Sequence, residues 1–268
     1  MATMKTVAFR LGLFVLLVIG MVFLTACSPV LKVAVADSGS IVYSVESSVS
    51  PLIEETVRSF TGAHQSLPLF NEEQILQALR SAGLSSVGVD TPDNSSLIVS
   101  ARIESSIATE TGAQGKGAGT IPSLGTGSVC QDMVPQVAGA IGYCHSSQVG
   151  QRKLVLTISP DVLRQVMGIV PAETAEYMDL LSAPILTGES MTAAEYADLI
   201  GVIYGDSVAK ELRRATVRIL VTAPAEVQAA TVSVPAGRVR TQGRYVEFSL
   251  PLPELLSYLG KIEFTVQY

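Results

Sequence analysis

The C-terminal part of the chain alternates apolar and polar residues over three segments, and this pattern restricts the fold more than any other feature. Apolar residues occupy every second position at 217–221, 246–250 and 262–266. Successive side chains of a β-strand point to opposite faces, so each segment predicts a strand with one face on a core and one toward water. Such half-buried strands are typical of antiparallel sheets.

The N-terminal half repeats the strand signal and adds two helices. Alternation at 31–35 and 41–45, around Asp37-Ser38-Gly39, predicts a β-hairpin. Ser50-Pro51 predicts the start of a helix that ends near Gly62, and the capping-box spacing from Asn71 predicts a second helix that ends near Gly83. Segments 84–90 and 96–103 predict two more strands.

The second half begins with a predicted strand at 153–159 and continues with helices. Ser159-Pro160 opens the first, 171–184 gives another, Thr192 and Glu195 form a capping box before 193–205, and 207–214 gives the last. On the third of these helices, Tyr196, Leu199, Ile200 and Ile203 fall on one face. We therefore predict an α+β fold for residues 31–268, with helices packed on one face of a mainly antiparallel sheet. A Gly, Ser and Thr-rich excursion at 105–129 interrupts it, and its Gly115-Lys116 lacks the spacing of a phosphate-binding loop.

The N-terminus carries an export signal. Lys5 and Arg10 precede an uncharged apolar run, Leu11–Leu24, which is short for a membrane-spanning helix of about 20 residues. The sequence Leu24-Thr25-Ala26-Cys27 that follows resembles the lipobox of bacterial lipoproteins. That resemblance implies a signal peptide at 1–26, diacylglycerol on Cys27 and a lipid-anchored N-terminus at 27–30. An uncleaved signal anchor and a soluble secreted form are the alternatives.

An anchor of this kind places the protein on the cell membrane or the outer membrane, with the mature domain outside the cytoplasm. One acyl chain attaches a protein only marginally, whereas two or more make the attachment stable. Removing residues 1–26 leaves 16 basic and 24 acidic residues, a formal charge of −8. Such an acidic chain argues against nucleic acid as a partner, and against adhesion to anionic lipid headgroups beyond the anchor itself.

Two cysteines remain once Cys27 is assigned to the lipid. Cys130 and Cys144 lie in a predicted exported, oxidising compartment, and we expect a disulfide between them. The closed loop would stabilise the fold by about 3 kcal/mol on the chain-entropy estimate. Two free thiols are the main alternative, and a metal site with His145 lacks the paired short spacings of zinc ligands.

The C-terminal segment from Val234 to Tyr268 contains a Pro-Ala-Gly turn, a strand, a proline-flanked helical turn and a final strand. This order of elements resembles the closing β-segment of some bacterial envelope lipoproteins, including the LppM-like ones. The resemblance covers about the last 50 residues and carries no catalytic motif, so it implies the envelope address without implying an activity.

The candidates for catalysis are incomplete. Ser207 and Lys210 match the S-x-x-K motif of penicillin-binding enzymes, but the partner motifs S-D-N and K-T-G are absent after residue 27. The carboxylate pairs Glu173 with Glu176 and Glu195 with Asp198 share helix faces, where solvated side chains are the expectation. His64 and His145 fall in predicted loops. We therefore nominate no catalytic residue, no metal site and no cofactor.

Binding is the remaining possibility. A groove between the helices of 160–214 and the sheet would be lined by Tyr177, Met178, Tyr196 and Tyr204, although aromatic stripes on helices are more often core. The sequence favours a lipid-anchored, non-enzymatic binding or assembly module, whose partner is an envelope protein or a small molecule. The alternative is an envelope hydrolase with a serine or metal-carboxylate site.

Overall fold

The structure is a computed structural model that describes residues 28–37, 40–61, 70–81, 86–103, 133–134, 141–145, 152–160 and 183–268. The larger of its two sheets has seven strands in the order β10-β11-β8-β1-β2-β4-β3. Their bounds are β1 Val30–Val35, β2 Ile41–Ser48, β3 Val87–Asp90, β4 Ser96–Ile103, β8 Thr216–Thr222, β10 Arg238–Gln242 and β11 Tyr245–Pro251. All neighbours are antiparallel except β1 and β8, which run parallel.

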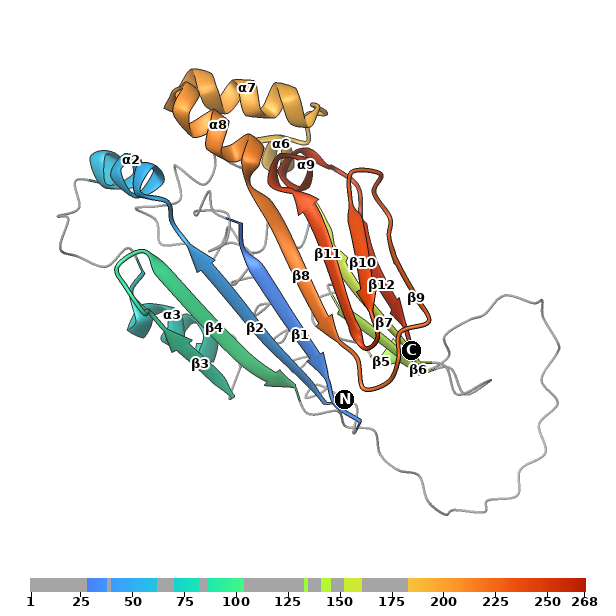
Figure 1. Ribbon diagram of the computed structural model, residues 1–268. Coiled ribbons are helices and arrows are strands. Elements are labelled where there is room, and N and C mark those ends of the chain that lie inside the picture. The colour runs from blue at the N-terminus through green and yellow to red at the C-terminus, as the bar shows by residue number, and fades with distance from the viewer. Residues whose placement is uncertain are drawn as a thin grey trace, which may run out of the picture.

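The second sheet has five strands in the order β5-β6-β7-β12-β9, all antiparallel. It consists of β5 Met133–Val134, β6 Ile141–His145, β7 Arg152–Ile158, β9 Ala229–Val232 and β12 Ile262–Gln267. Figure 1 shows it beside the β8, β11 and β10 side of the larger sheet.

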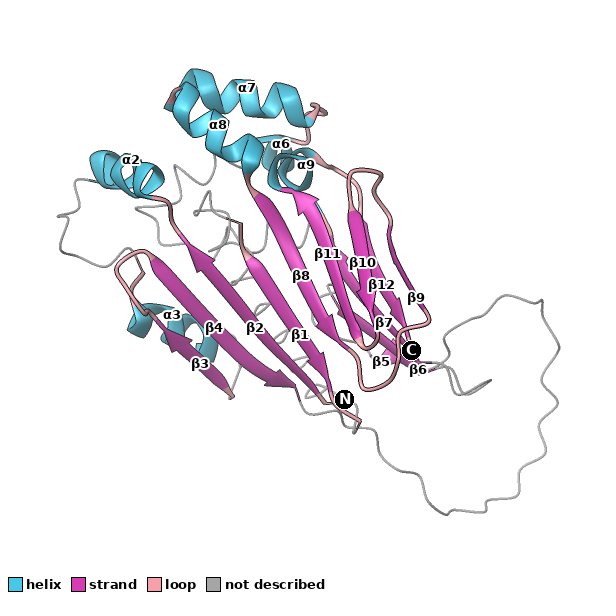
Figure 2. Cartoon of the chain, in the orientation of Figure 1, coloured by secondary structure: helices cyan, strands magenta, loops and turns pink. Residues whose placement is uncertain are grey.

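The described helices are α2 Pro51–Thr61, α3 Glu72–Ser81, α6 Ala183–Thr187, α7 Ala193–Tyr204, α8 Asp206–Arg214 and α9 Leu252–Ser257. Figure 2 shows α2, α6, α7, α8 and α9 gathered at one end of the strands. The helix α3 contacts β3, at the edge of the larger sheet. The predicted α+β fold with a mainly antiparallel sheet is confirmed.

The predicted capping box fixes the start of α7, and a glycine turn joins α7 to α8. Thr192 accepts a hydrogen bond from the backbone N–H of Glu195, and the Glu195 carboxylate accepts from the N–H of Thr192, which completes the capping box. Gly205 then joins the two helices with φ 95° and ψ 156°, a conformation that a residue with a side chain rarely adopts. The sequence thereby sets a sharp turn between α7 and α8.

One cluster of buried side chains includes residues from both sheets and the helices. At the junction of the sheets, Phe248 of β11 and Phe264 of β12 meet edge to face, with ring centroids 5.3 Å apart. Both rings are buried, and aromatic pairs in this geometry add stabilisation beyond the area they bury. The two sheets therefore share a core at this point.

Several sequence predictions differ from the structure in detail. The stripe on α7 buries Tyr196 and Ile200 as expected, but Ile203 is exposed. The loop predicted around His145 is wrong at that residue, which ends β6. The sequence does not predict the strand β9, because its four residues give too short an alternation. The excursion at 105–129 and the helix predicted to follow Pro160 lie outside the described residues. The helix predicted at 171–184 also lies outside them, except for Ala183 and Pro184, which begin α6.

Candidate functional site

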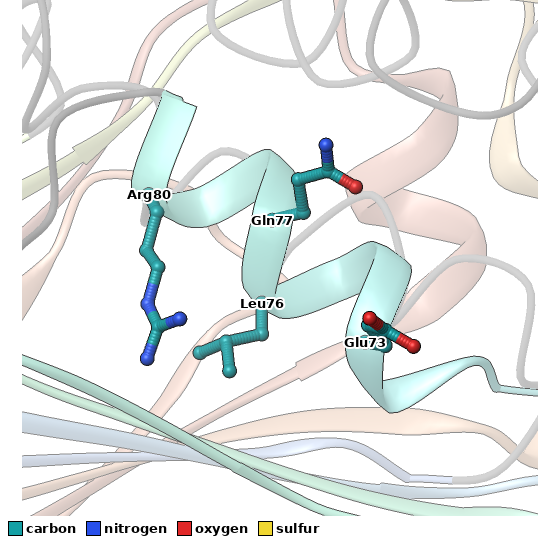
Figure 3. Close-up of a pocket in the computed structure, with 4 residues that line it drawn as sticks. All are labelled: Glu73, Leu76, Gln77 and Arg80. Carbon is teal, nitrogen blue, oxygen red and sulfur yellow. The ribbon is translucent and has the colours of Figure 1, made fainter.

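The candidate site is a cavity of about 520 Å³ along one face of α3. The described residues that line it are Glu73, Leu76, Gln77 and Arg80. Their spacing of three, one and three residues places them on one side of an α-helix, since positions three and four apart are neighbours on its surface. Figure 3 shows Leu76 and Arg80 extending to the same side of the helix.

The lining combines an apolar patch with charge of both signs. Leu76 is half-buried, whereas Glu73, Gln77 and Arg80 are exposed. The hydrogen bonds and ion pairs of the described residues include none made by the Glu73 carboxylate or the Arg80 guanidinium. Small-molecule sites usually have volumes of about 300–1,000 Å³ and a mostly apolar lining. The volume of this cavity falls in that range, but three of its four described lining residues are polar.

Another polar group, the hydroxyl of Tyr43, is buried against the larger sheet. Tyr43 on β2 is 1% exposed, and its hydroxyl has no hydrogen-bond partner among the described residues. Burial raises the pKa of this hydroxyl far above its ordinary value, because the charged form would be desolvated. Tyr43 pairs with Ala101 on the neighbouring strand β4. Ala101 pairs in turn with Val87 of β3, the strand that α3 contacts.

An unsatisfied buried hydroxyl costs about 1–3 kcal/mol, so such groups in proteins usually meet a partner. The Tyr43 side chain lies on the core-facing side of the sheet, and its hydroxyl can act as a donor and as an acceptor.

The structure places the predicted site residues in different surroundings. Cys27, Cys130 and Tyr177 lie outside the described residues, and Cys144 lies on β6, paired in register with Met133. The predicted lipid attachment and disulfide therefore stay predictions.

The remaining tyrosines of the predicted groove belong to α7. Tyr196 has none of its surface exposed and packs in the core, and Tyr204 is half-buried against the same cluster. Burial raises the pKa of the Tyr196 hydroxyl, and the nearby Tyr204 adds to the shift. Their role in ligand binding stays a prediction.

The S-x-x-K motif lies on α8 at the surface of the protein. Ser207 and Lys210 are both exposed, while Val208, Ala209 and Leu212 form the buried face of the helix. A catalytic serine needs a base within hydrogen-bond reach. The hydrogen bonds of the described residues include none between these two side chains.

The carboxylates of Glu195 and Asp198 contact different partners. Glu195 accepts from the Thr192 N–H at 2.8 Å and from the Thr192 hydroxyl at 2.9 Å, and the first of these bonds contributes most to lowering the pKa of Glu195. Asp198 forms an ion pair with Arg213 of α8. The pair Glu173 and Glu176 and the residue His64 lie outside the described residues.

The cavity along α3 was not found by sequence reasoning. The capping box and the helix were predicted, but the polar residues Glu73, Gln77 and Arg80 were ordinary for an exposed helix face. The signal available in the sequence was the four-residue spacing of Leu76 and Arg80, which places both on one face of the helix. It carries little information alone, because most surface helices contain such pairs.

Comparison of the chain with protein-family models, curated proteins and solved structures finds no match. Among the described residues, His, Cys, Asp and Glu form no group of three that could hold a metal ion. The described helices include none with the length and apolar character needed to cross a membrane.

Proposed function

We propose that the protein is a lipid-anchored lipoprotein of the bacterial envelope that binds a small amphiphilic ligand without chemical conversion. The observation that carries the binding role is the cavity of about 520 Å³ on α3, where the Arg80 guanidinium and the Leu76 side chain extend to the same side. The address rests on the lipobox resemblance at Cys27, which places the domain at a membrane surface outside the cytoplasm.

The composition of the cavity supports an amphiphile over a fully polar ligand. A guanidinium offers a bidentate site for an anionic headgroup, and the adjacent leucine offers apolar surface. Glu73 lies seven positions before Arg80, about 10 Å along the helix, and would favour a ligand with a donor group at its far end. An envelope hydrolase remains the alternative, and no described contact favours it.

The binding role is tested with anilinonaphthalene sulfonate as a fluorescent probe, because it combines an anionic group with an aromatic body. Titration of the purified protein gives the affinity, and Arg80→Gln is expected to weaken it by about 10- to 150-fold, since a charge-assisted hydrogen bond contributes about 1.5–3 kcal/mol. Leu76→Asp is expected to weaken it further.

Arg240→Gln is the matched control, because Arg240 is an exposed arginine on β10, at the opposite edge of the sheet from β3. Equal affinities for the wild type, Arg80→Gln and Leu76→Asp would refute the proposed site. Unchanged unfolding by far-UV circular dichroism shows that each variant is folded when it is titrated.

A further inference from the structure

The two residues that follow the predicted lipid-bearing Cys27 contact the start of β8. The backbone N–H of Thr216 donates to the Ser28 hydroxyl oxygen at 3.4 Å, and the N–H of Arg218 donates to the Pro29 carbonyl at 2.9 Å. Consecutive Cα atoms are about 3.8 Å apart, so Cys27 has no spacer between its lipid and this contact. A lipid on Cys27 would therefore hold the start of β8, and the end of α8 that precedes it, close to the membrane.

The helix that ends at this point has a basic outer face. Lys210, Arg213 and Arg214 are exposed and lie three and four positions apart, so they project from one side of α8. Val208, Ala209 and Leu212 are buried on the other side. We call the three cations the α8 basic face.

Few acidic groups neutralise the α8 basic face. Asp198 of α7 forms an ion pair with Arg213, and Glu211 is turned toward α2, where its carboxylate accepts from the Ser50 hydroxyl at 2.5 Å. The ion pairs of the described residues include none made by Lys210 or Arg214. Asp206 lies at the opposite end of the helix from the anchor.

The macrodipole of α8 accounts for only part of this arrangement. Arg213 and Arg214 occupy the last turn, where a helix favours cations. Lys210 lies one turn earlier and gains little from the dipole. A local basic surface is also contrary to the overall charge of −8 after residue 26.

We infer that the α8 basic face is a docking surface for anionic lipid headgroups, which orients the domain on the membrane that holds its anchor. This inference rests on the proposed lipid anchor. Basic residues near an anionic surface each contribute about 1 kcal/mol within a Debye length, and the short connection to Cys27 keeps them within that range. The anchor supplies attachment, and the α8 basic face determines which side of the domain meets the membrane.

The chain contains no tryptophan, so a single introduced tryptophan reports on one surface. Ser207→Trp places it on exposed α8, and Gln242→Trp places it at an exposed position of β10 as the control. The processed protein is reconstituted into vesicles of phosphatidylcholine alone or mixed with phosphatidylglycerol, each containing spin-labelled lipid. The expected result is strong quenching of the α8 tryptophan in the anionic vesicles, with little quenching in 1 M salt or at the β10 position.

Charge variants test the cause in the same vesicles. Lys210→Gln with Arg214→Gln is expected to lower the docked fraction of the α8 reporter, with each substitution weakening docking about fivefold. Arg238→Gln with Arg240→Gln removes the same charge from β10 and is expected to change nothing. Equal quenching at both positions, or loss of quenching only with the β10 variant, would overturn the inference.

Intact mass of the reconstituted protein separates the two proposals. A lipid-modified chain with an unquenched α8 tryptophan would refute the docking surface and leave the anchor standing. A chain without lipid would refute the anchor on which the docking surface depends.

Discussion

The contact between Phe248 and Phe264 gives the most direct test of the fold, because the two rings belong to different sheets. The rings lie 5.3 Å apart at an interplanar angle of 70°, and at most 2% of either residue is exposed. Aromatic pairs in this geometry contribute about 0.5–1.5 kcal/mol beyond the area that they bury. Removing one ring should therefore remove most of the interaction that the other ring makes.

The perturbation is a double-mutant cycle with Phe248→Leu and Phe264→Leu. Leucine keeps most of the volume, so each single substitution is expected to cost about 1–2 kcal/mol in free energy of unfolding. The double variant should cost less than the sum of the two, by about 0.5–1.5 kcal/mol, since the second substitution has no aromatic contact left to lose. Urea unfolding followed by far-UV circular dichroism measures all four proteins.

A distant pair provides the control for this cycle. Val99 on β4 is also buried, and it lies four strands from β11 in the larger sheet, which is about 19 Å at the usual strand spacing. Phe248→Leu and Val99→Ala should add within about 0.5 kcal/mol. Additive costs for the two phenylalanines, or separate unfolding transitions for the two sheets, would refute a shared core.

Further predictions concern α7 and the turn that follows it. Thr192→Ala removes the N-cap of α7 and should lower the free energy of unfolding by about 1 kcal/mol, whereas Thr241→Ala, at an exposed position of β10, is the control in the same urea titration. Gly205→Ala should cost about 1–3 kcal/mol, because φ 95° disfavours a side chain, and a cost no greater than that of an ordinary surface alanine would contradict the observed turn. The lowered pKa of Glu195 predicts that its stabilising effect is fully present above the unfolded pKa of about 4.3 and is lost as the pH falls through the lower folded value. Unfolding titrations from pH 7 to pH 3 should therefore show that the stability difference between the wild type and Glu195→Gln narrows in acid, and a constant difference would show that the carboxylate does not act in its charged form.

The elements that sequence predicted best are those whose signals are local. The capping box at Thr192 and Glu195 set the start of α7, and the alternation at 262–267 identified β12 and its buried face. Both signals depend on neighbouring residues alone. The short strand β9 and the role of Gly205 gave weaker local signals and were not found.

The pairing of strands could not be predicted, because it depends on contacts between distant segments. The parallel neighbours β1 and β8 are separated by about 180 residues in the chain, and no local pattern specifies that partnership. The division of the strands into two sheets follows from the same long-range packing, which brings Phe248 against Phe264.

The candidate site could not be predicted for the same reason, because it depends on the packing of distant segments. Leu76 and Arg80 were recognisable as parts of a helix, but a cavity exists only where another segment stands back from that face. The unpartnered hydroxyl of Tyr43 was equally hidden, since its alternation with apolar residues indicated only that it faces the core. Local sequence identified the helix and the strand, and tertiary packing gave them their chemical surroundings.

The most direct test of the central claim is the intact mass of the native protein, measured beside Cys27→Ala and before and after reduction. A lipid anchor on Cys27 predicts loss of residues 1–26 together with a mass gain that matches acyl chains, and Cys27→Ala should abolish both changes. Reduction should add the mass of two hydrogens if Cys130 and Cys144 are joined. An unprocessed chain, or a cleaved chain without lipid, would contradict the lipid anchor and the membrane-bound function proposed from it.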